Sequence, residues 1–300
     1  MHPAYSIIIF TTLSGLGYGL AVMLGLGFLD PSALPTKIAY LAALALISIG
    51  LLASLLHLGN PQRAWRALSQ WRSSWLSREG VMAIATFIPL TSNTALCLFM
   101  NRQDGILGLI TVLGALITVY CTSMIYASLK TVDSWHTRLT PLCFLLFSLA
   151  GGALLAAFFA GPRGLPLQLL ALLLVLLALV AKMVWRKRAR TLVPLSTPES
   201  ATGLGGIGTV RLLERPHALD NYLTREMGFR VARKHAEKLW VIAFVSGILL
   251  PVLALLTAMA VGGVLGLCLM VIAVLTHLVG LFVERWLFFA EAKHAVMNYY

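Results

Sequence analysis

Long apolar runs decide what this sequence can fold into. Hydrophobic residues make up 59% of the 300 residues and charged residues only 11%, with a mean hydropathy of +0.87. Too few polar side chains remain to cover a water-exposed surface. A helix needs roughly 20 apolar residues to cross about 30 Å of hydrocarbon. The sequence therefore predicts an integral membrane protein with spans near residues 4–29, 37–57, 80–100, 105–129, 139–160, 165–185, 239–260 and 263–288.

The eight predicted spans are expected to be helices. A membrane β-barrel needs strands of about ten residues in which polar and apolar positions alternate, whereas residues 169–180 are apolar throughout. Lipid offers no partner to an unpaired backbone group, which favours helices. The predicted fold class is thus all-α: a polytopic membrane protein, one bundle of eight transmembrane helices forming a single integral membrane domain over residues 1–300. The glycine-rich residues 14–19 are expected to serve close helix packing, since no strand precedes them as a dinucleotide-binding loop requires.

Lysine and arginine are distributed unequally between the two ends of the predicted spans. One side carries 20 of the 23 basic residues, leaving Lys37, Arg102 and Arg163 for the other. Because cytoplasmic loops carry the excess of basic residues, both termini and the segment from His57 to Glu79 are expected on the cytoplasmic side of the cell's inner (cytoplasmic) membrane. The formal net charge of +12 fits this asymmetry and attraction to anionic headgroups. Nucleic acid is not an expected partner, because so little of the protein is soluble.

The only sizeable polar region is the predicted cytoplasmic loop over residues 186–238. Its first part, residues 191–208, has the Pro, Ser, Thr and Gly content of an irregular linker. Its second part, residues 221–238, mixes charges at helical spacing and predicts a basic interfacial helix that runs into the seventh span. Two interpretations stay open: a solvated connector that touches headgroups, or a docking surface for a soluble partner.

Cysteine and histidine give little support for a metal site. The four cysteines lie singly in apolar spans, at Cys97, Cys121, Cys143 and Cys268. Isolated buried cysteines act as small hydrophobes, so we expect no iron–sulfur cluster and no other metal site in this chain. A b-type haem would need two facing histidines at matching depth, yet His57 ends a span and His277 falls near mid-span. Haem b is not favoured but stays open; His277 is expected to be hydrogen-bonded within the bundle, although ionisable groups at membrane depth are functional candidates.

His57 and Glu79 are placed where two predicted spans reach the same membrane surface. The second span ends at His57 and the third begins at Glu79. A histidine can hydrogen-bond a quinone oxygen, and a carboxylate can relay protons to water, since both change protonation near neutral pH when partly desolvated. The indoles of Trp65, Trp71 and Trp75 could line an entrance for a flat ring. The pair therefore predicts a proton-handling site beside a lipid-soluble carrier.

Simpler interpretations of this segment remain. The tryptophans can anchor the membrane interface and the arginines can enforce topology, while Glu79 can pair with Arg78 or cap the third helix.

A secondary transporter is the alternative from another functional class. Transporters commonly carry internal repeats around a mid-membrane site, and the first four spans show no convincing repeat in the last four.

Several segments resemble the membrane-anchor subunit of dimethyl sulfoxide reductase-type molybdoenzyme complexes. They are His57-Leu-Gly-Asn-Pro-Gln-Arg-Ala-Trp-Arg-Ala-Leu, Trp75-Leu-Ser-Arg-Glu79, Ile125-Tyr126, Thr131-Val-Asp-Ser-Trp-His-Thr-Arg-Leu-Thr-Pro141 and Glu284-Arg-Trp-Leu-Phe-Phe-Ala-Glu291. The resemblance implies an anchor that performs no substrate chemistry itself. It would hold an iron–sulfur subunit and a molybdopterin catalytic subunit at the membrane and exchange electrons with quinone, either ubiquinone or menaquinone. The family's quinone-site histidine and acidic residue fall on His57 and Glu79.

The resemblance is nearest to anchors of cytoplasmic sulfite dehydrogenase (quinone). The loop segments Arg215-Pro-His217, Asn221-Tyr222-Leu and Glu226-Met-Gly-Phe-Arg-Val-Ala-Arg-Lys-His235 are similar to those anchors, and the basic bias places the partner in the cytoplasm. An anchor of a dimethyl sulfoxide or related reductase that oxidises quinol is the alternative. Beside His57 and Glu79, we expect Arg66, Trp71 and Arg78 to contact quinone. The residues expected to dock the partner are Arg63, Arg72, Arg230 and Arg233.

Overall fold

The computed structural model describes residues 4–56, 59–194, 196–211, 213–214 and 231–298, without the side chains of Arg163 and residues 231–234. In these residues eight helices are long and apolar enough to cross a membrane, and no strand is present. Seven spans are single helices: α1 (Tyr5–Gly25), α2 (Leu34–Leu55), α3 (Trp75–Met100), α4 (Gly105–Ala127), α5 (Leu139–Ala160), α6 (Leu165–Thr191) and α11 (Gly263–Ala290). The remaining span joins α9 (Val231–Phe244), the π-helical turn η3 (Val245–Leu249) and α10 (Leu250–Val261). The predicted all-α, polytopic fold is confirmed.

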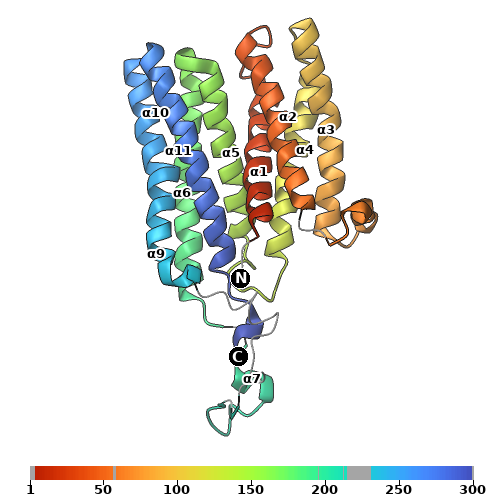
Figure 1. Ribbon diagram of the computed structural model, residues 1–300, viewed down its shortest axis with the longest axis vertical. Coiled ribbons are helices and arrows are strands. Elements are labelled where there is room, and N and C mark those ends of the chain that lie inside the picture. The colour runs from red at the N-terminus through yellow and green to blue at the C-terminus, as the bar shows by residue number, and fades with distance from the viewer. Residues whose placement is uncertain (1–3, 57–58, 195, 212, 215–230, 299–300) are drawn as a thin grey trace.

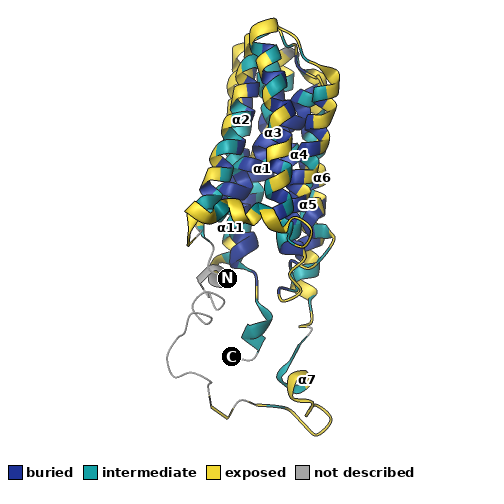
Figure 2. Ribbon diagram, turned by 90° about the vertical axis from the view of Figure 1, so that its right-hand side faces the viewer, coloured by how far each residue is buried: buried dark blue, intermediate teal, exposed yellow. Residues whose placement is uncertain are grey.

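The helices stand side by side, and three of the short elements gather at one end of the bundle (Figure 1). That end carries the 3-10 helix η1 (Pro61–Gln70), the short helix α7 (Pro198–Thr202) and the 3-10 turn η4 (Ala295–Asn298); we call it the η1 end. The 3-10 turn η2 (Gly161–Arg163) lies at the opposite end. Helix α1 is central: 78% of its most apolar 18-residue stretch is buried, against 28–61% for the other spans. Figure 2 shows the same pattern, with buried residues inside and exposed residues on the outer helix faces.

Small residues let α1 approach its neighbours closely. A Cβ on Gly19 would lie 1.8 Å from the Ser148 carbonyl oxygen of α5, and one on Gly17 would lie 2.6 Å from Ile47 of α2. Ser148 Oγ also donates to the Gly15 carbonyl over 2.6 Å. The predicted packing role of residues 14–19 is thereby confirmed.

Helix α3 begins one turn earlier than the predicted span because Ser74 caps it. The Ser74 hydroxyl accepts from the Ser77 N–H, which satisfies one of the free donors at a helix start. Arg78 then ties the segment just after η1 to this first turn: its Nε donates to the Trp71 carbonyl over 3.0 Å and its Nη2 to the Arg72 carbonyl over 2.7 Å. Glu79 therefore lies inside the helix rather than at its start.

His277 stabilises a break in the seventh span. Pro251 has no N–H, so it cannot supply the helical hydrogen bond to the carbonyl of Gly247, four residues earlier. Instead His277 Nδ1 lies 2.6 Å from that carbonyl oxygen, and Nδ1 carries the proton because a carbonyl only accepts. The prediction that His277 is hydrogen-bonded within the bundle is confirmed. The same crossing brings α11 against η3, where a Cβ on Gly280 would lie 2.1 Å from Gly247 Cα.

The polar region differs in its boundaries from the predicted loop over residues 186–238. Helix α6 continues through its basic end to Thr191, so residues 186–191 are helical. A short helix, α7, follows with a capping box made by Thr197 and Ser200. The predicted interfacial helix over residues 221–238 falls partly outside the described residues, and its described part belongs to α9, which continues into the seventh span.

Candidate functional site

Glu79 is a buried carboxyl group at the η1 end of the bundle. It is 4% exposed and lies in the second turn of α3. The η1 segment covers this turn: the Ser77 hydroxyl donates to the Ala67 carbonyl, and a Cβ on Gly80 would lie 2.7 Å from Leu68 Cδ2. The Glu79 carboxyl meets Thr122 of α4 through a hydrogen bond between Oε1 and Oγ1. Its polar contact is thus with the bundle interior.

The surroundings of Glu79 suit a carboxyl that gains and loses a proton. Among the described residues Glu79 has no ion-pair partner within 4.0 Å. Thr122 Oγ1 also lies 3.0 Å from the Thr118 carbonyl oxygen, and its hydroxyl has only one proton to donate. Both contacts are hydrogen bonds when Glu79 is protonated and donates to Thr122, which then donates to Thr118. The ionised form keeps only one of them.

The other described residues predicted to contact quinone lie on η1, just after it and at the start of α3. His57 lies outside the described residues. Arg66 and Trp71 are exposed, with the Arg66 guanidinium 5.5 Å from the ring of Trp65. Arg78 lies 4.3 Å from the Trp75 ring and donates to the carbonyls of Trp71 and Arg72, just after η1. The interpretation in which Glu79 pairs with Arg78 is therefore wrong.

The residues predicted to dock a partner are only partly described. Arg63 lies on η1 and Arg72 just after it, and both are exposed. Arg72 stands 5.7 Å from the ring of Trp71. Arg230 lies outside the described residues, and so does the side chain of Arg233. Arg63 and Arg72 therefore present positive charge at the same end of the bundle as Glu79.

An ionic cluster outside the predicted site lies between α6 and α11. Lys182 Nζ is 2.6 Å from Glu284 Oε1, with side-chain exposures of 12% and 9%. Arg285 Nε lies 3.6 Å from Glu284 Oε2, and the Arg285 guanidinium lies 3.7 Å from the centre of the Phe144 ring. The signal was available, because ionisable side chains inside apolar spans are rare and mark functional candidates.

An aromatic cluster beside these charges joins three of the segments that carry the family resemblance. The Trp135 ring stacks on Phe288 at 5.1 Å, and its Nε1 donates to the Phe288 carbonyl over 3.0 Å. Tyr126 contacts both rings edge-on, at 5.4 and 5.8 Å. The segments around residues 125, 131–141 and 284–291 therefore meet at the η1 end.

The fold and these buried groups define a class of protein: an α-helical, multi-pass membrane protein with ionisable side chains buried near one end of its bundle. Sequence comparison gives the particular family. Residues 1–290 match the family described as DMSO reductase anchor subunit (DmsC). The protein is 34% identical to a sulfite dehydrogenase subunit of Allochromatium vinosum, over all of this chain and 99% of that relative. It is 31% identical to an anaerobic dimethyl sulfoxide reductase chain of Escherichia coli, over 46% of this chain and 50% of the relative.

The protein therefore belongs to the DMSO reductase anchor subunit family. The predicted resemblance is confirmed, both for the family and for its similarity to a sulfite dehydrogenase subunit. A match to an anaerobic dimethyl sulfoxide reductase chain of Haemophilus influenzae, 32% identical over 38% of this chain and 41% of the relative, agrees with the same family.

Proposed function

We propose that this chain is the quinone-reactive anchor of a molybdopterin and iron–sulfur oxidoreductase that oxidises sulfite. It holds the iron–sulfur and catalytic subunits at the cytoplasmic face of the inner membrane and passes their electrons to membrane quinone. The full-length similarity to a sulfite dehydrogenase subunit supports this choice, because the similarity to these two dimethyl sulfoxide reductase relatives extends over half of this chain or less. A dimethyl sulfoxide reductase anchor, which oxidises quinol, is the nearest alternative.

The observation that carries the proposal is the environment of Glu79. The carboxyl is buried, hydrogen-bonded to a hydroxyl and without a described ion-pair partner. Quinone reduction requires two protons for two electrons, and proton transfer is efficient from a group that changes protonation in place. In this proposal His57 hydrogen-bonds a quinone oxygen and delivers a proton, while Glu79 relays protons to the site.

Residues of η1, of the segment after it and of the start of α3 supply the remaining contacts in the proposal. Arg66, Trp71 and Arg78 contact the quinone at the membrane interface, where indoles and arginines commonly lie. Docking of the iron–sulfur subunit falls to Arg63, Arg72, Arg230 and Arg233. Electron transfer over a short distance then requires the partner's iron–sulfur cluster to lie next to η1.

The test separates electron delivery from quinone chemistry in the intact complex. We expect His57→Ala and Glu79→Gln to leave subunit assembly and dye-linked sulfite oxidation unchanged, while quinone-linked turnover falls about 100-fold, the lower range for loss of a proton-transfer group. Glu199→Gln is the matched control, since Glu199 lies in the polar region beyond α6. Normal quinone kinetics in both site variants would remove the two residues from the mechanism.

A further inference from the structure

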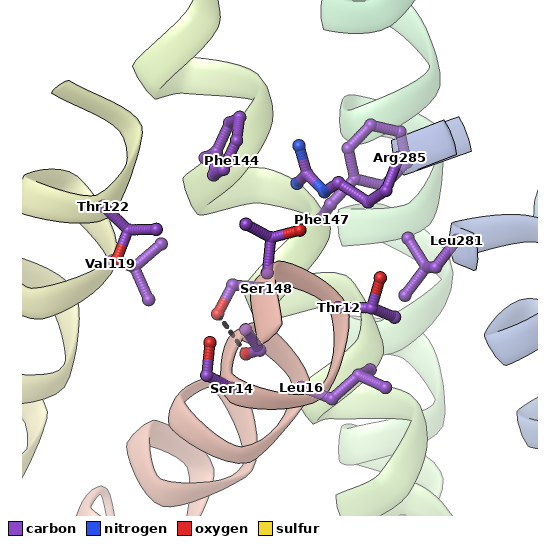
Figure 3. Close-up of a pocket in the computed structure, with 12 residues that line it drawn as sticks. Thr12, Ser14, Leu16, Val119, Thr122, Phe144, Phe147, Ser148, Leu281 and Arg285 are labelled. Carbon is purple, nitrogen blue, oxygen red and sulfur yellow. Dashed lines mark hydrogen bonds between the residues drawn. The ribbon is translucent and has the colours of Figure 1, made fainter. Parts of the chain in front are cut away.

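A small cavity, lined in part by polar side chains, lies on the inner side of the Glu79 site, where α1, α4, α5 and α11 meet. Its volume is about 20 Å³, which is room for one water molecule. Thr122, the hydrogen-bond partner of Glu79, lines one side, and Arg285 lines the other (Figure 3). Thr12 Oγ1 is buried at this cavity and has no hydrogen-bond partner among the described residues. The cavity therefore has polar groups for a water molecule to satisfy.

The cavity adjoins a second one that contains the ionic cluster. Phe147 and Leu281 line both cavities. The second has a volume of about 30 Å³, and Lys182, Glu284 and Glu291 are among the residues that line it. Polar groups thus continue from Thr122 past Arg285, the sequence neighbour of Glu284, into the space between α6 and α11.

The second cavity adjoins a third and wider one at the η1 end. Arg186 and Glu291 line the second cavity and also a third, of about 370 Å³, together with Glu237 and Lys293. A space of that size at the end of the bundle is large enough for several water molecules. Burial raises the pKa of Glu291 above its usual range, against the lowering effect of Arg186 and Lys182. Glu291 is therefore a carboxyl that exchanges protons at higher pH than an exposed glutamate.

Glu284 lines the second cavity, which lies between the first and the third. Its Oε1 is held by Lys182, but its Oε2 is buried without a hydrogen-bond partner among the described residues, at 3.6 Å from Arg285 Nε. A buried carboxylate oxygen normally takes hydrogen bonds, so Oε2 is a position to which a cavity water can donate. Lys182 and Arg285 hold the side chain in place while leaving this oxygen open.

We propose that protons reach Glu79 through the bundle, from Glu291 to Glu284, through the cavity lined by Thr12 and Arg285, and over Thr122. This inference rests on the proposed function and names the route by which protons reach its quinone site. Each two-electron reduction of quinone takes up two protons. Each proton enters from water at the η1 end, protonates Glu291 and then Glu284, crosses the cavity water and restores the proton that Glu79 gave to the quinone site. Every relay group returns to its starting state.

A purely structural role is the competing explanation, since Lys182 and Glu284 also join α6 to α11. Removing one partner of a buried pair leaves an uncompensated charge, whereas replacing both is often neutral for stability. The double variant Lys182→Met/Glu284→Gln therefore removes the carboxylate without leaving Lys182 as a buried charge that has lost its partner. Lys187→Met/Glu199→Gln is the control, because it removes one positive and one negative charge outside the three cavities of the route.

The experiment compares quinone-linked turnover in H2O and D2O in the intact complex, with a short-chain quinone as acceptor. For Lys182→Met/Glu284→Gln we expect turnover to fall about 10-fold or more and the solvent isotope effect to rise. Dye-linked sulfite oxidation and the KM for quinone should stay unchanged, as they do in the control. Turnover within about twofold of the wild type, with an unchanged isotope effect, would overturn the route.

A second variant keeps the inference testable if the double variant does not assemble. Glu284→Asp keeps the charge and shortens the reach, so we expect a smaller loss of turnover with the same rise in isotope effect; no change in either would overturn the route. Failure of the proposed function has a different signature. In that case the wild-type complex oxidises sulfite with a dye but reduces no quinone.

Discussion

At the residue scale, one hydroxyl decides how the Glu79 carboxyl is held. Thr122→Val keeps the shape of the side chain and removes the hydrogen bond to Glu79. Leaving a buried polar group unsatisfied costs about 1–3 kcal/mol, so we expect the thermal unfolding midpoint in detergent to fall, together with quinone-linked turnover. Thr91→Val is the control, because Thr91 is exposed on α3 and donates only to its own helix. Equal behaviour of the two variants would contradict this role for Thr122.

Glu291 gives a pH dependence at the same scale. Burial raises its pKa above the ordinary 4.5, despite Arg186 and Lys182 and with a smaller raising effect from Glu237. A group whose pKa is higher in the folded state stabilises the fold at low pH and loses that contribution as the pH rises through its folded pKa. We therefore expect the wild type to lose stability relative to Glu291→Gln as the pH rises above 4.5. Thermal unfolding midpoints across pH check this, and a constant difference between the two proteins would contradict it.

At the element scale, two glycines in one motif of α1 should respond oppositely to alanine. A Cβ on Gly19 would overlap the backbone of α5, whereas a Cβ on Gly15 meets nothing within 4 Å. Gly19→Ala must push α1 from α5, and overpacking of this kind costs about 1–3 kcal/mol. Gly15→Ala should be neutral or stabilising, since alanine favours helix over glycine. Unfolding midpoints in detergent distinguish the two, and equal effects would mean that this crossing does not limit stability.

The elements themselves could be predicted because apolar runs of this length have one solution in lipid. The helix ends could not, since Ser74 extends α3 by a turn and α6 continues through residues 186–191. Only part of the site could be predicted from the sequence. Glu79 was identified because it lies at a span boundary, whereas its partner Thr122 is an ordinary threonine in an apolar span. Which face of α4 meets α3 depends on helix rotation, and no residue pattern within one span fixes it. The pairing of Lys182 with Glu284 was hidden for the same reason.

At the scale of the whole molecule, the charge asymmetry and the fold agree on which segments share an end. The start of α1, η1, α7 and η4 all lie at the η1 end (Figure 1), the end to which the sequence assigns 20 of the 23 basic residues. Glu79, the ionic cluster and the wide cavity lie at this end as well. Quinone chemistry, proton entry and partner docking would therefore share one membrane face.

That face is expected to be cytoplasmic, and single cysteines can test it. Ser32→Cys lies in the loop between α1 and α2 at the opposite end, and Gly206→Cys lies beyond α7 at the η1 end; both positions are exposed. Cys268, the exposed native cysteine, is first changed to serine. Because basic loops stay in the cytoplasm, a membrane-impermeant maleimide should label Ser32→Cys in intact cells and Gly206→Cys only in inverted vesicles. The reverse pattern would place the Glu79 end and its partner outside the cytoplasm, which is incompatible with the proposed cytoplasmic sulfite-oxidising complex.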